Sequence, residues 1–310
     1  MKNKLLLTAL TGATLLLSSV STLGSNRALA AEPTPAPAVA TVNADPALWV
    51  IKDADTTIYL FGTVHVMKDN VKWFDGGVKA AYDASQEIVF EIDTSDPQAM
   101  QGIVMKLAID PDGPTLTQKL GPDLAASLDK ALKDVGIPMA AFEKFEPWIV
   151  PVIMTGAVLV KTGYKPESGV ETQLTAALKK DGKTLGTLET AEEQMGFFDN
   201  LPEAVQIAFL KSTIADLPKT GPVLDEMVAE WAKGNPEALD ALLNKALTAT
   251  PELEKVLLND RNVRWADWVE KRMAKPGTVF MAVGAGHLAG KNSVQEKLKA
   301  KKLTATRIPS

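Results

Sequence analysis

Short apolar runs along the chain are widely spaced and predict only a few strands. Residues 48–51 and 56–62 flank the turn-forming segment KDADT, so together they predict a β-hairpin. Long stretches with a different pattern separate the remaining runs, and this spacing indicates one sheet whose strands come from distant parts of the chain. The other predicted strands are 87–92, 184–188, 278–283 and 303–308.

Apolar residues recur at three- and four-residue spacing through most of the remaining chain, which predicts amphipathic helices. Prolines often stand where these segments begin, at positions where the missing N–H costs nothing. The predicted helices are 76–85, 96–108, 121–134, 170–180, 191–199, 202–215, 221–233, 236–246 and 252–273.

Strands near both ends of the chain, with long helical stretches between them, predict an α/β fold built on a central mixed β-sheet flanked by helices. The helical insertions, at about 95–183 and 191–274, are too long for simple crossovers, so we expect them to form a lid or a subdomain. We expect one domain that spans 47–310.

The first 30 residues predict a cleavable signal peptide, because Lys2 and Lys4 precede an apolar stretch and the segment ALA at 28–30 is a small-x-small cleavage site. Thr, Ser and Gly interrupt the apolar stretch, which is shorter than the roughly 20 residues of a membrane span, so no stable span is expected after cleavage. Residues 31–46 are rich in Ala and Pro and predict a flexible linker. We therefore expect a periplasmic or secreted protein.

Composition narrows the possible chemistry. The chain has no cysteine, which excludes disulfides, thiolate nucleophiles and thiolate metal sites. Three of the 33 Lys+Arg residues fall in the predicted signal, so the rest of the chain has 30 against 38 Asp+Glu and a net charge of −8, which argues against nucleic acid or anionic lipid as a partner. No segment matches a P-loop, a nucleophile-elbow serine, a zincin helix or a dinucleotide fingerprint.

The only two histidines stand in matching contexts. His65 in YLFGTVHVM and His287 in AVGAGHLAG each lie three residues past a glycine and just after a predicted buried strand, where α/β sheets place their ligands. A lone histidine is more often a hydrogen-bonded structural residue, but two in matching context favour a shared site. Gly62, Gly284 and Gly286 would let the backbone approach a bound group, so they are the candidate cofactor-binding residues.

Acidic residues at strand ends are the next candidates. Glu91 lies near the carboxyl end of the otherwise apolar run EIVFEI, where a carboxylate is costly unless it is paired or bound to a cation. Alternation places it on the same face as Glu87, so the solvent face of an edge strand is the alternative, and Asp93 could serve instead. Glu189 follows TLGTL in the same way, although an acid at a helix N-terminus is an equally ordinary interpretation, and that interpretation also weakens Glu171.

The segment NDRNVRWADWVEKR places Arg261, Arg264, Trp265 and Trp268 on one helical face. An aromatic stripe of this kind usually packs in the core with the arginines at its rim. If Arg261 instead points at the carboxyl edge of the sheet, it could pair with a site carboxylate or hold an anionic substrate oxygen.

The chain resembles the TraB/GumN family, which is related to the TIKI metalloproteases, from about Leu48 to the C-terminus. Six segments carry the resemblance: YLFGTVHV, IVFEID, SGVETQL, GKTLGTLETAEEQ, DRNVRWADWV and VFMAVGAGHLAG. The resemblance implies a central sheet that brings the two histidines and an acid together. By analogy with the TIKI branch, it also implies divalent-metal-dependent peptide hydrolysis.

The resemblance extends to single positions. One departure is Glu171, where many relatives carry Asp, and this leaves the chemistry open. The family motif falls on Gly62, His65, Glu91, Gly284 and His287, and further family positions fall on Glu189, Arg261 and Asn262.

We therefore expect a metal-dependent hydrolase acting on a peptide or protein substrate. His65 and His287 would bind a divalent transition metal (Zn, Mn or Co) through neutral imidazoles, with Glu91 as a third ligand or as the base for a bound water. Glu189 is a further candidate ligand, and Arg261 is a further candidate catalytic residue. The alternatives are a non-catalytic haem- or metal-binding protein, by analogy with ChaN-like haem-binding proteins, and a scaffold in which the histidines only bind backbone.

Overall fold

The computed structural model describes residues 40–244 and 250–309. The predicted α/β class is confirmed: a six-stranded mixed sheet with strand order β6-β5-β7-β3-β2-β8 lies among helices. The expected signal peptide at 1–30 lies outside the described residues. Within the described part, no helix is both long enough and apolar enough to cross a membrane.

The predicted hairpin is confirmed. Strands β2 (Leu48–Lys52) and β3 (Thr56–Thr63) pair antiparallel, and the short β8 (Thr306–Arg307) pairs antiparallel with β2 on its other side. The Asp53 carboxylate closes the turn by accepting hydrogen bonds from the backbone N–H groups of Asp55 and Thr56, as an Asp in a turn commonly does.

Four strands run parallel through the rest of the sheet, so their carboxyl ends meet at one edge. Alternate residues of each strand face opposite sides: Ile88 and Phe90 pack in one apolar core, whereas Val89 packs in the other. In spatial order the four strands are β6 (Thr184–Thr187), β5 (Glu87–Phe90), β7 (Gly277–Gly284) and β3.

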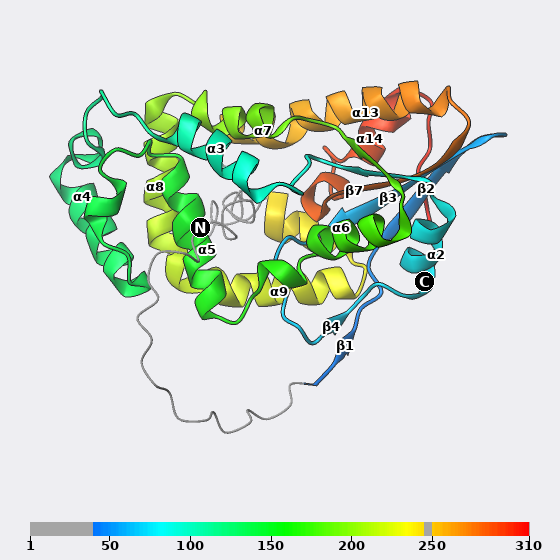
Figure 1. Cartoon of the computed structure of the whole chain (residues 1–310), viewed down its shortest axis with the longest axis horizontal. Helices are drawn as coiled ribbons and strands as arrows, with labels where there is room; N and C mark the ends of the chain where they lie inside the picture. Colours follow the sequence, from blue (N-terminus) through cyan, green and yellow to red (C-terminus); the bar gives the residue numbers. More distant parts are fainter. Residues whose placement is uncertain (1–39, 245–249, 310) are drawn as a thin grey trace.

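Helices cover both faces of the sheet (Figure 1). The core on one face contains side chains of α13 (Asp260–Met273) and α14 (Val294–Ala300). The core on the other face contains side chains of α2 (Gly76–Ala84), α6 (Val170–Asp181) and α9 (Thr220–Ala232). The strands are therefore buried on both sides, as parallel strands usually are.

The two helical insertions pack against each other around a third apolar core, which contains no strand residue. Figure 1 shows α4, α5 and α8 at the end of the molecule away from β2 and β3. The helices of this core are α3 (Pro97–Ala108), α4 (Leu116–Val135), α5 (Ile149–Lys161), α7 (Ala191–Asp199), α8 (Glu203–Asp216) and α12 (Pro251–Glu254).

The helix predicted for 252–273 differs from the observed one in its middle. A π-helical turn at Lys255–Asn259 separates α12 from α13, so the backbone is helical throughout but gains a wider turn just before Arg261. The helix predicted for 236–246 begins as α10 (Pro236–Leu239) and continues as a second π-helical turn, Asp240–Asn244, and its last residues lie outside the described part. Wider turns of this kind are frequent at functional sites.

The expectation of a flexible linker at 31–46 is wrong for its last residues, which pair with the folded part of the chain. Strand β1 (Val42–Asn43) pairs in parallel with β4 (Val71–Lys72), and the backbone N–H of Asp45 donates to the carbonyl of Ala232 at 2.8 Å. These residues are held by backbone hydrogen bonds, which the pattern of side chains in the sequence does not predict. Residues 31–39 lie outside the described part.

Candidate functional site

The carboxyl edge of the parallel strands brings the predicted site residues together. Glu189, Glu91, His287 and His65 each follow the carboxyl end of one strand, in the spatial order β6, β5, β7, β3. Neighbouring strands lie about 4.8 Å apart, so each side chain lies beside the next. The sheet therefore places both histidines, which are 222 residues apart in the chain, on adjacent strands, as the sequence predicts.

Arg261 on α13 joins three of these four residues. Its Nη2 donates to Glu91 Oε2 at 2.6 Å and to Glu189 Oε2 at 2.8 Å, and its Nη1 contacts His287 Nε2 at 3.1 Å. Its side chain is 4% exposed. Of the two predicted arrangements, the structure therefore has the one in which Arg261 points at the sheet edge and pairs with site carboxylates.

Glu91 lies in the middle of this edge. Its Oε2 also accepts from Gln194 Nε2 at 2.8 Å, and its Oε1 accepts from the backbone N–H of Gly284 at 2.7 Å. Burial alone would raise the pKa of the carboxyl, but Arg261 and the histidines lower this pKa to about 2. The alternative of an exposed edge strand is wrong, because β5 lies between β6 and β7.

Glu189 is buried and accepts hydrogen bonds on both carboxylate oxygens. Besides Arg261, its Oε1 accepts from Trp265 Nε1 at 3.1 Å and from Arg264 Nη2 at 3.2 Å. The helix that follows is capped separately, by a capping box of Thr190 and Glu193. The Glu189 carboxylate therefore holds Arg261 in place instead of capping the helix.

His287 is held in one tautomer. The Arg261 guanidinium can only donate, so His287 Nε2 accepts, and the ring proton must lie on Nδ1, which donates to Asn262 Oδ1 at 2.6 Å. Burial and the nearby positive charge of Arg261 lower the pKa of His287 to about 3. The ring of Trp265 lies against the imidazole, with 4.3 Å between ring centroids. His287 is therefore neutral at physiological pH.

His65 is the more open histidine, with its side chain 20% exposed. Its Nδ1 lies 2.5 Å from Glu171 Oε1, and Thr63 Oγ1 donates to the same oxygen at 2.5 Å. Burial alone would lower the pKa of His65, but the Glu171 carboxylate raises this pKa above its usual value. Glu171, which the sequence discounts as an ordinary helix N-terminal acid, is thus a partner of His65.

The three candidate glycines each lie close to other protein groups. A Cβ at Gly62 would lie 3.1 Å from Ala285 Cα, and a Cβ at Gly284 would lie 3.2 Å from Glu91 Oε1. A Cβ at Gly286 would lie 3.2 Å from the Asn244 side chain. The missing side chains let the ends of β3 and β7 approach each other and the acid.

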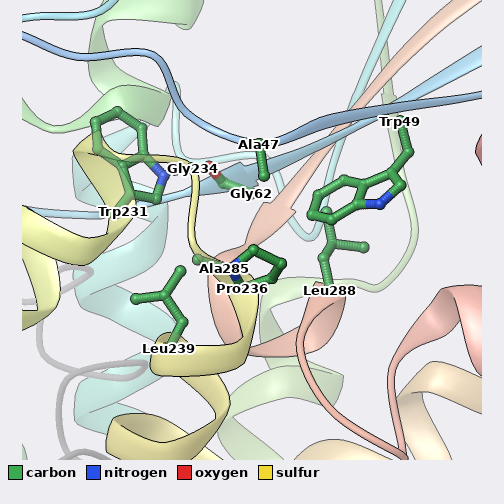
Figure 2. A pocket seen from close by; sticks show the side chains of 9 residues that line it. All are labelled: Ala47, Trp49, Gly62, Trp231, Gly234, Pro236, Leu239, Ala285 and Leu288. Atoms are coloured by element: carbon green, nitrogen blue, oxygen red, sulfur yellow. Dashed lines mark hydrogen bonds between the residues drawn. The ribbon is translucent and has the colours of Figure 1, made fainter. Parts of the chain in front are cut away.

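Trp231 on α9 contacts the end of β3 next to the site. Figure 2 shows Gly62, Ala285 and Trp231 around a small cavity, and the Trp231 indole N–H donates to the carbonyl of Gly62 at 2.8 Å. The strand end that precedes His65 is therefore fixed by a buried hydrogen bond from a helical insertion.

Several other candidates lie outside this network. Asp93 is exposed and accepts a hydrogen bond from the backbone N–H of Ser95, and Glu87 pairs with Arg272 at the other end of β5. Trp268 is only partly buried and packs against the core beneath α13. The described contacts of these three side chains are therefore with other parts of the fold.

Two members of the network had no independent signal in the sequence. Gln194 lies one turn into the helix after Glu189, and Asn262 follows Arg261, and neither belongs to a recognisable local motif. Only the resemblance marked Asn262. Both are amide side chains, which are common on protein surfaces, and their roles depend on contacts with residues distant in the chain.

Histidine and carboxylate side chains, which are common ligands of divalent transition metals, lie together at this edge. Metal-binding histidines usually hold their other ring nitrogen on a carboxylate or a carbonyl, and here Nδ1 of His65 is held by Glu171 and Nδ1 of His287 by Asn262. In its neutral form each ring thus has Nε2 as the accepting nitrogen, and Glu91 adds an ionised oxygen. Within residues 40–244 and 250–309, however, no group of three His, Cys, Asp or Glu side chains is arranged so that it could hold an ion. The guanidinium of Arg261 lies against Nε2 of His287.

Comparison with known proteins shows which family the chain resembles over most of its length. The family model described as the TraB/PrgY/gumN family matches residues 47–307. The uncharacterized protein YbaP of Escherichia coli (strain K12) is 24% identical over 254 residues, which cover 82% of this chain and 92% of the relative. An uncharacterized protein of Treponema pallidum (strain Nichols) is 20% identical over 272 residues, 82% of this chain and 80% of the relative. No solved structure gives a significant match.

Proposed function

The chain belongs to the TraB/PrgY/gumN family, and from this membership and the geometry of the site we propose that it is a metal-dependent hydrolase that acts on peptides or proteins. One observation carries the proposal. The only two histidines of the chain lie on adjacent strand ends beside an ionised Glu91, and each ring is held through Nδ1. A structural pair of histidines has no need of matched tautomers.

In this proposal His65 and His287 hold the metal through Nε2, and Glu91 is the third ligand or the base. A bound metal would supply a nucleophile by lowering the pKa of a water ligand towards about 7. Glu91 remains ionised at neutral pH because Arg261 and the Gly284 N–H stabilise its charged form. Zn, Mn and Co all suit two nitrogens and a carboxylate.

Arg261 and Glu189 have supporting tasks. Arg261 places a permanent positive charge at the strand ends, where it can stabilise negative charge on a substrate oxygen during attack on a carbonyl. Glu189 holds the guanidinium through three hydrogen bonds, to Nε and Nη2. For a metal to bind, the contact between Arg261 Nη1 and His287 Nε2 must be exchanged for the metal.

Calorimetry tests the metal site directly. Zn²⁺, Mn²⁺ and Co²⁺ are titrated into protein purified without chelator or affinity metal, and we expect saturable one-to-one binding of at least one ion. The variants His65→Ala and His287→Ala should lose it, whereas Asp123→Asn, which changes an exposed carboxylate on α4, should bind as the wild type does. Identical heats for the wild type and both histidine variants would end the proposal.

A second measurement tests the reaction. The metal-loaded protein is incubated with a mixed peptide library and the products are followed by mass spectrometry, with Glu91→Gln and excess chelator as the two inactive controls. We expect cleavage that both controls abolish. A loaded protein that leaves the library intact is not a peptidase, and a Soret band that forms on haem addition and requires the histidines would favour the haem-binding alternative instead.

We further propose that the protein acts in the periplasm or outside the cell after removal of residues 1–30. Intact-mass analysis of protein recovered from extracytoplasmic fractions should give a chain that begins at Ala31. A full-length chain confined to the cytoplasm would contradict this location without affecting the proposed chemistry.

A further inference from the structure

We infer that Glu171 is a positioning residue that holds His65 in its Nδ1–H tautomer and so presents Nε2 for binding. The inference rests on the proposed function for its purpose, but the tautomer itself can be measured without any metal or substrate. It assigns a task to the first helical insertion, whose helix α6 also contributes apolar side chains to the core on one face of the sheet.

Two hydrogen bonds on one oxygen define the contact. Glu171 Oε1 accepts from Thr63 Oγ1 and lies 2.5 Å from His65 Nδ1. A carboxylate can only accept, so Nδ1 must carry a proton, and in the neutral ring Nε2 is then the accepting nitrogen. Thr63 comes from the end of β3, two residues before His65, so the carboxylate fixes the ring relative to its own strand.

Backbone contacts hold Glu171 in register with His65. The N–H of Val170 donates to the carbonyl of Val64 at 3.0 Å. A Cβ at Gly169 would lie only 1.9 Å from the carbonyl oxygen of His65. The first turn of α6 therefore lies directly on the backbone of the residue whose ring it orients, and only glycine permits this approach.

The second oxygen of Glu171 separates this role from ordinary ion pairing. Oε2 is buried and has no hydrogen-bond partner among the described residues. A buried acid kept only for stability would normally satisfy both oxygens, as Glu189 does. Leaving one oxygen unpaired costs free energy, which is acceptable where the contact serves a site.

The other histidine has the same arrangement with a different partner. Asn262 Oδ1 accepts from His287 Nδ1 at 2.6 Å. Both rings thus keep the same tautomer, one held by a carboxylate and one by an amide. The match across two unrelated segments of the chain is expected if both Nε2 atoms serve one ligand.

Nitrogen NMR of protein labelled with 15N-histidine tests the inference, because two histidines give only two sets of ring signals. Above the pKa of both rings, we expect wild-type His65 and His287 each to be protonated at Nδ1. In Glu171→Met, which keeps the side-chain length without an acceptor, His65 should lose its preference for the Nδ1–H form while His287 keeps it. Glu171→Gln retains an acceptor oxygen and should restore the wild-type signal.

Each outcome decides. Wild-type His65 protonated at Nε2 would overturn the inference, whatever the variants do. So would a Glu171→Met protein that is folded, as unchanged His287 signals show, and still keeps His65 in the Nδ1–H form. If Glu171→Met does not fold, the wild-type and Glu171→Gln spectra still decide, because both must show Nδ1–H.

Metal titration separates this inference from the proposed function. Removing the residue that hydrogen-bonds the other ring nitrogen of a metal-binding histidine typically weakens metal binding by about 10- to 100-fold. Glu171→Met should therefore lose metal affinity, and Glu171→Gln should lose less. If the wild type binds no metal but shows the expected tautomers, the proposed function fails and the role of Glu171 in positioning His65 stands.

Discussion

Arg261 is the residue on which the charge balance of the site depends. Its guanidinium contacts two carboxylates and one imidazole, and all four groups are at most 12% exposed. Burying a charge is costly unless it is paired, and here two carboxylates share one buried guanidinium cation. The half-exposed Arg264 is a second partner of Glu189. Burial and the Arg261 charge together make the neutral form of His287 the stable one.

Removal of Arg261 should therefore destabilise the fold strongly. Arg261→Met leaves the buried Glu91 without its guanidinium partner and Glu189 with only the half-exposed Arg264, so we expect the free energy of unfolding to fall by about 3–5 kcal/mol at neutral pH. Arg264→Met removes a half-exposed partner of the same Glu189 and should cost less than about 1 kcal/mol. Urea denaturation of the three proteins measures both values, and equal losses in the two variants would contradict this account.

His287 should make stability depend on pH. Its folded pKa of about 3 lies below the ordinary value of 6.5, so the unfolded chain takes up a proton that the folded chain does not. The stabilising contribution is present above pH 6.5 and is lost as pH falls, with a slope of at most about 1.4 kcal/mol per pH unit. His65 has the opposite sign, because its raised pKa adds stability that is lost as pH rises through the folded value.

The window between about pH 6 and 5 isolates His287, because most carboxyls stay ionised there. Urea denaturation in chelator should show the free energy of unfolding falling across this window in the wild type and much less in His287→Gln. A flat wild-type curve would mean that the folded protein also protonates His287.

At this scale the sequence predicted the acids and bases but not their partners. His65, His287, Glu91 and Glu189 could be found because each follows an apolar strand. Gln194 and the roles of Glu171 and Asn262 could not be found, because an amide or an acid in a helical turn looks the same whether it faces solvent or a histidine. Only the spatial order of the strands decides which it faces.

At the scale of elements, the sequence pattern predicted most of the helices and missed α5 and α14. Helix α5 (IVPVIMTGAVLVK) is apolar around most of its surface and includes Pro151, so no amphipathic period marks it. Helix α14 has seven residues, too few for a clear period. The π-helical turn before Arg261 was also invisible, since side-chain spacing changes by only one residue there.

The end of β3 packs closely against the turn that follows β7, and this contact can be tested by mutation. Gly62→Ala would place a Cβ 3.1 Å from Ala285 Cα, a backbone atom that cannot turn away, so the two strand ends must separate. We expect a loss of about 1–3 kcal/mol in unfolding free energy, as in other overpacked sites.

The same substitution in an open position gives the control. Gly102 is exposed within α3, and a Cβ there would meet nothing within 4 Å, so Gly102→Ala should stabilise the protein by about 0.5–1 kcal/mol through helix propensity. Thermal denaturation of both variants compares the signs directly. If Gly62→Ala is neutral, the close approach of the two histidine-bearing turns is not tight.

At the scale of the whole molecule, the site uses nearly every part of the chain. The sheet supplies the two histidines and Glu91, the first insertion supplies Glu171, and the second insertion supplies Gln194 and Arg261. The α/β class and the insertions were predictable, because strands near both ends of the chain must pair in one sheet, which leaves the helical segments between them as insertions. The packing of the insertions against each other was not, because it depends on contacts among helices far apart in sequence.

This construction means that no fragment and no unfolded chain should bind the proposed metal tightly. A ligand that binds only the folded state raises the free energy of unfolding, by about 2.7 kcal/mol when its concentration is 100 times the dissociation constant. We therefore expect each metal that binds in calorimetry to raise the thermal midpoint in proportion to the logarithm of its concentration. His65→Ala and His287→Ala should show no such rise, and Asp123→Asn should show all of it. If the thermal midpoint still rises with metal in both histidine variants, the stabilising ion binds elsewhere in the molecule, and the strand ends are not the metal site.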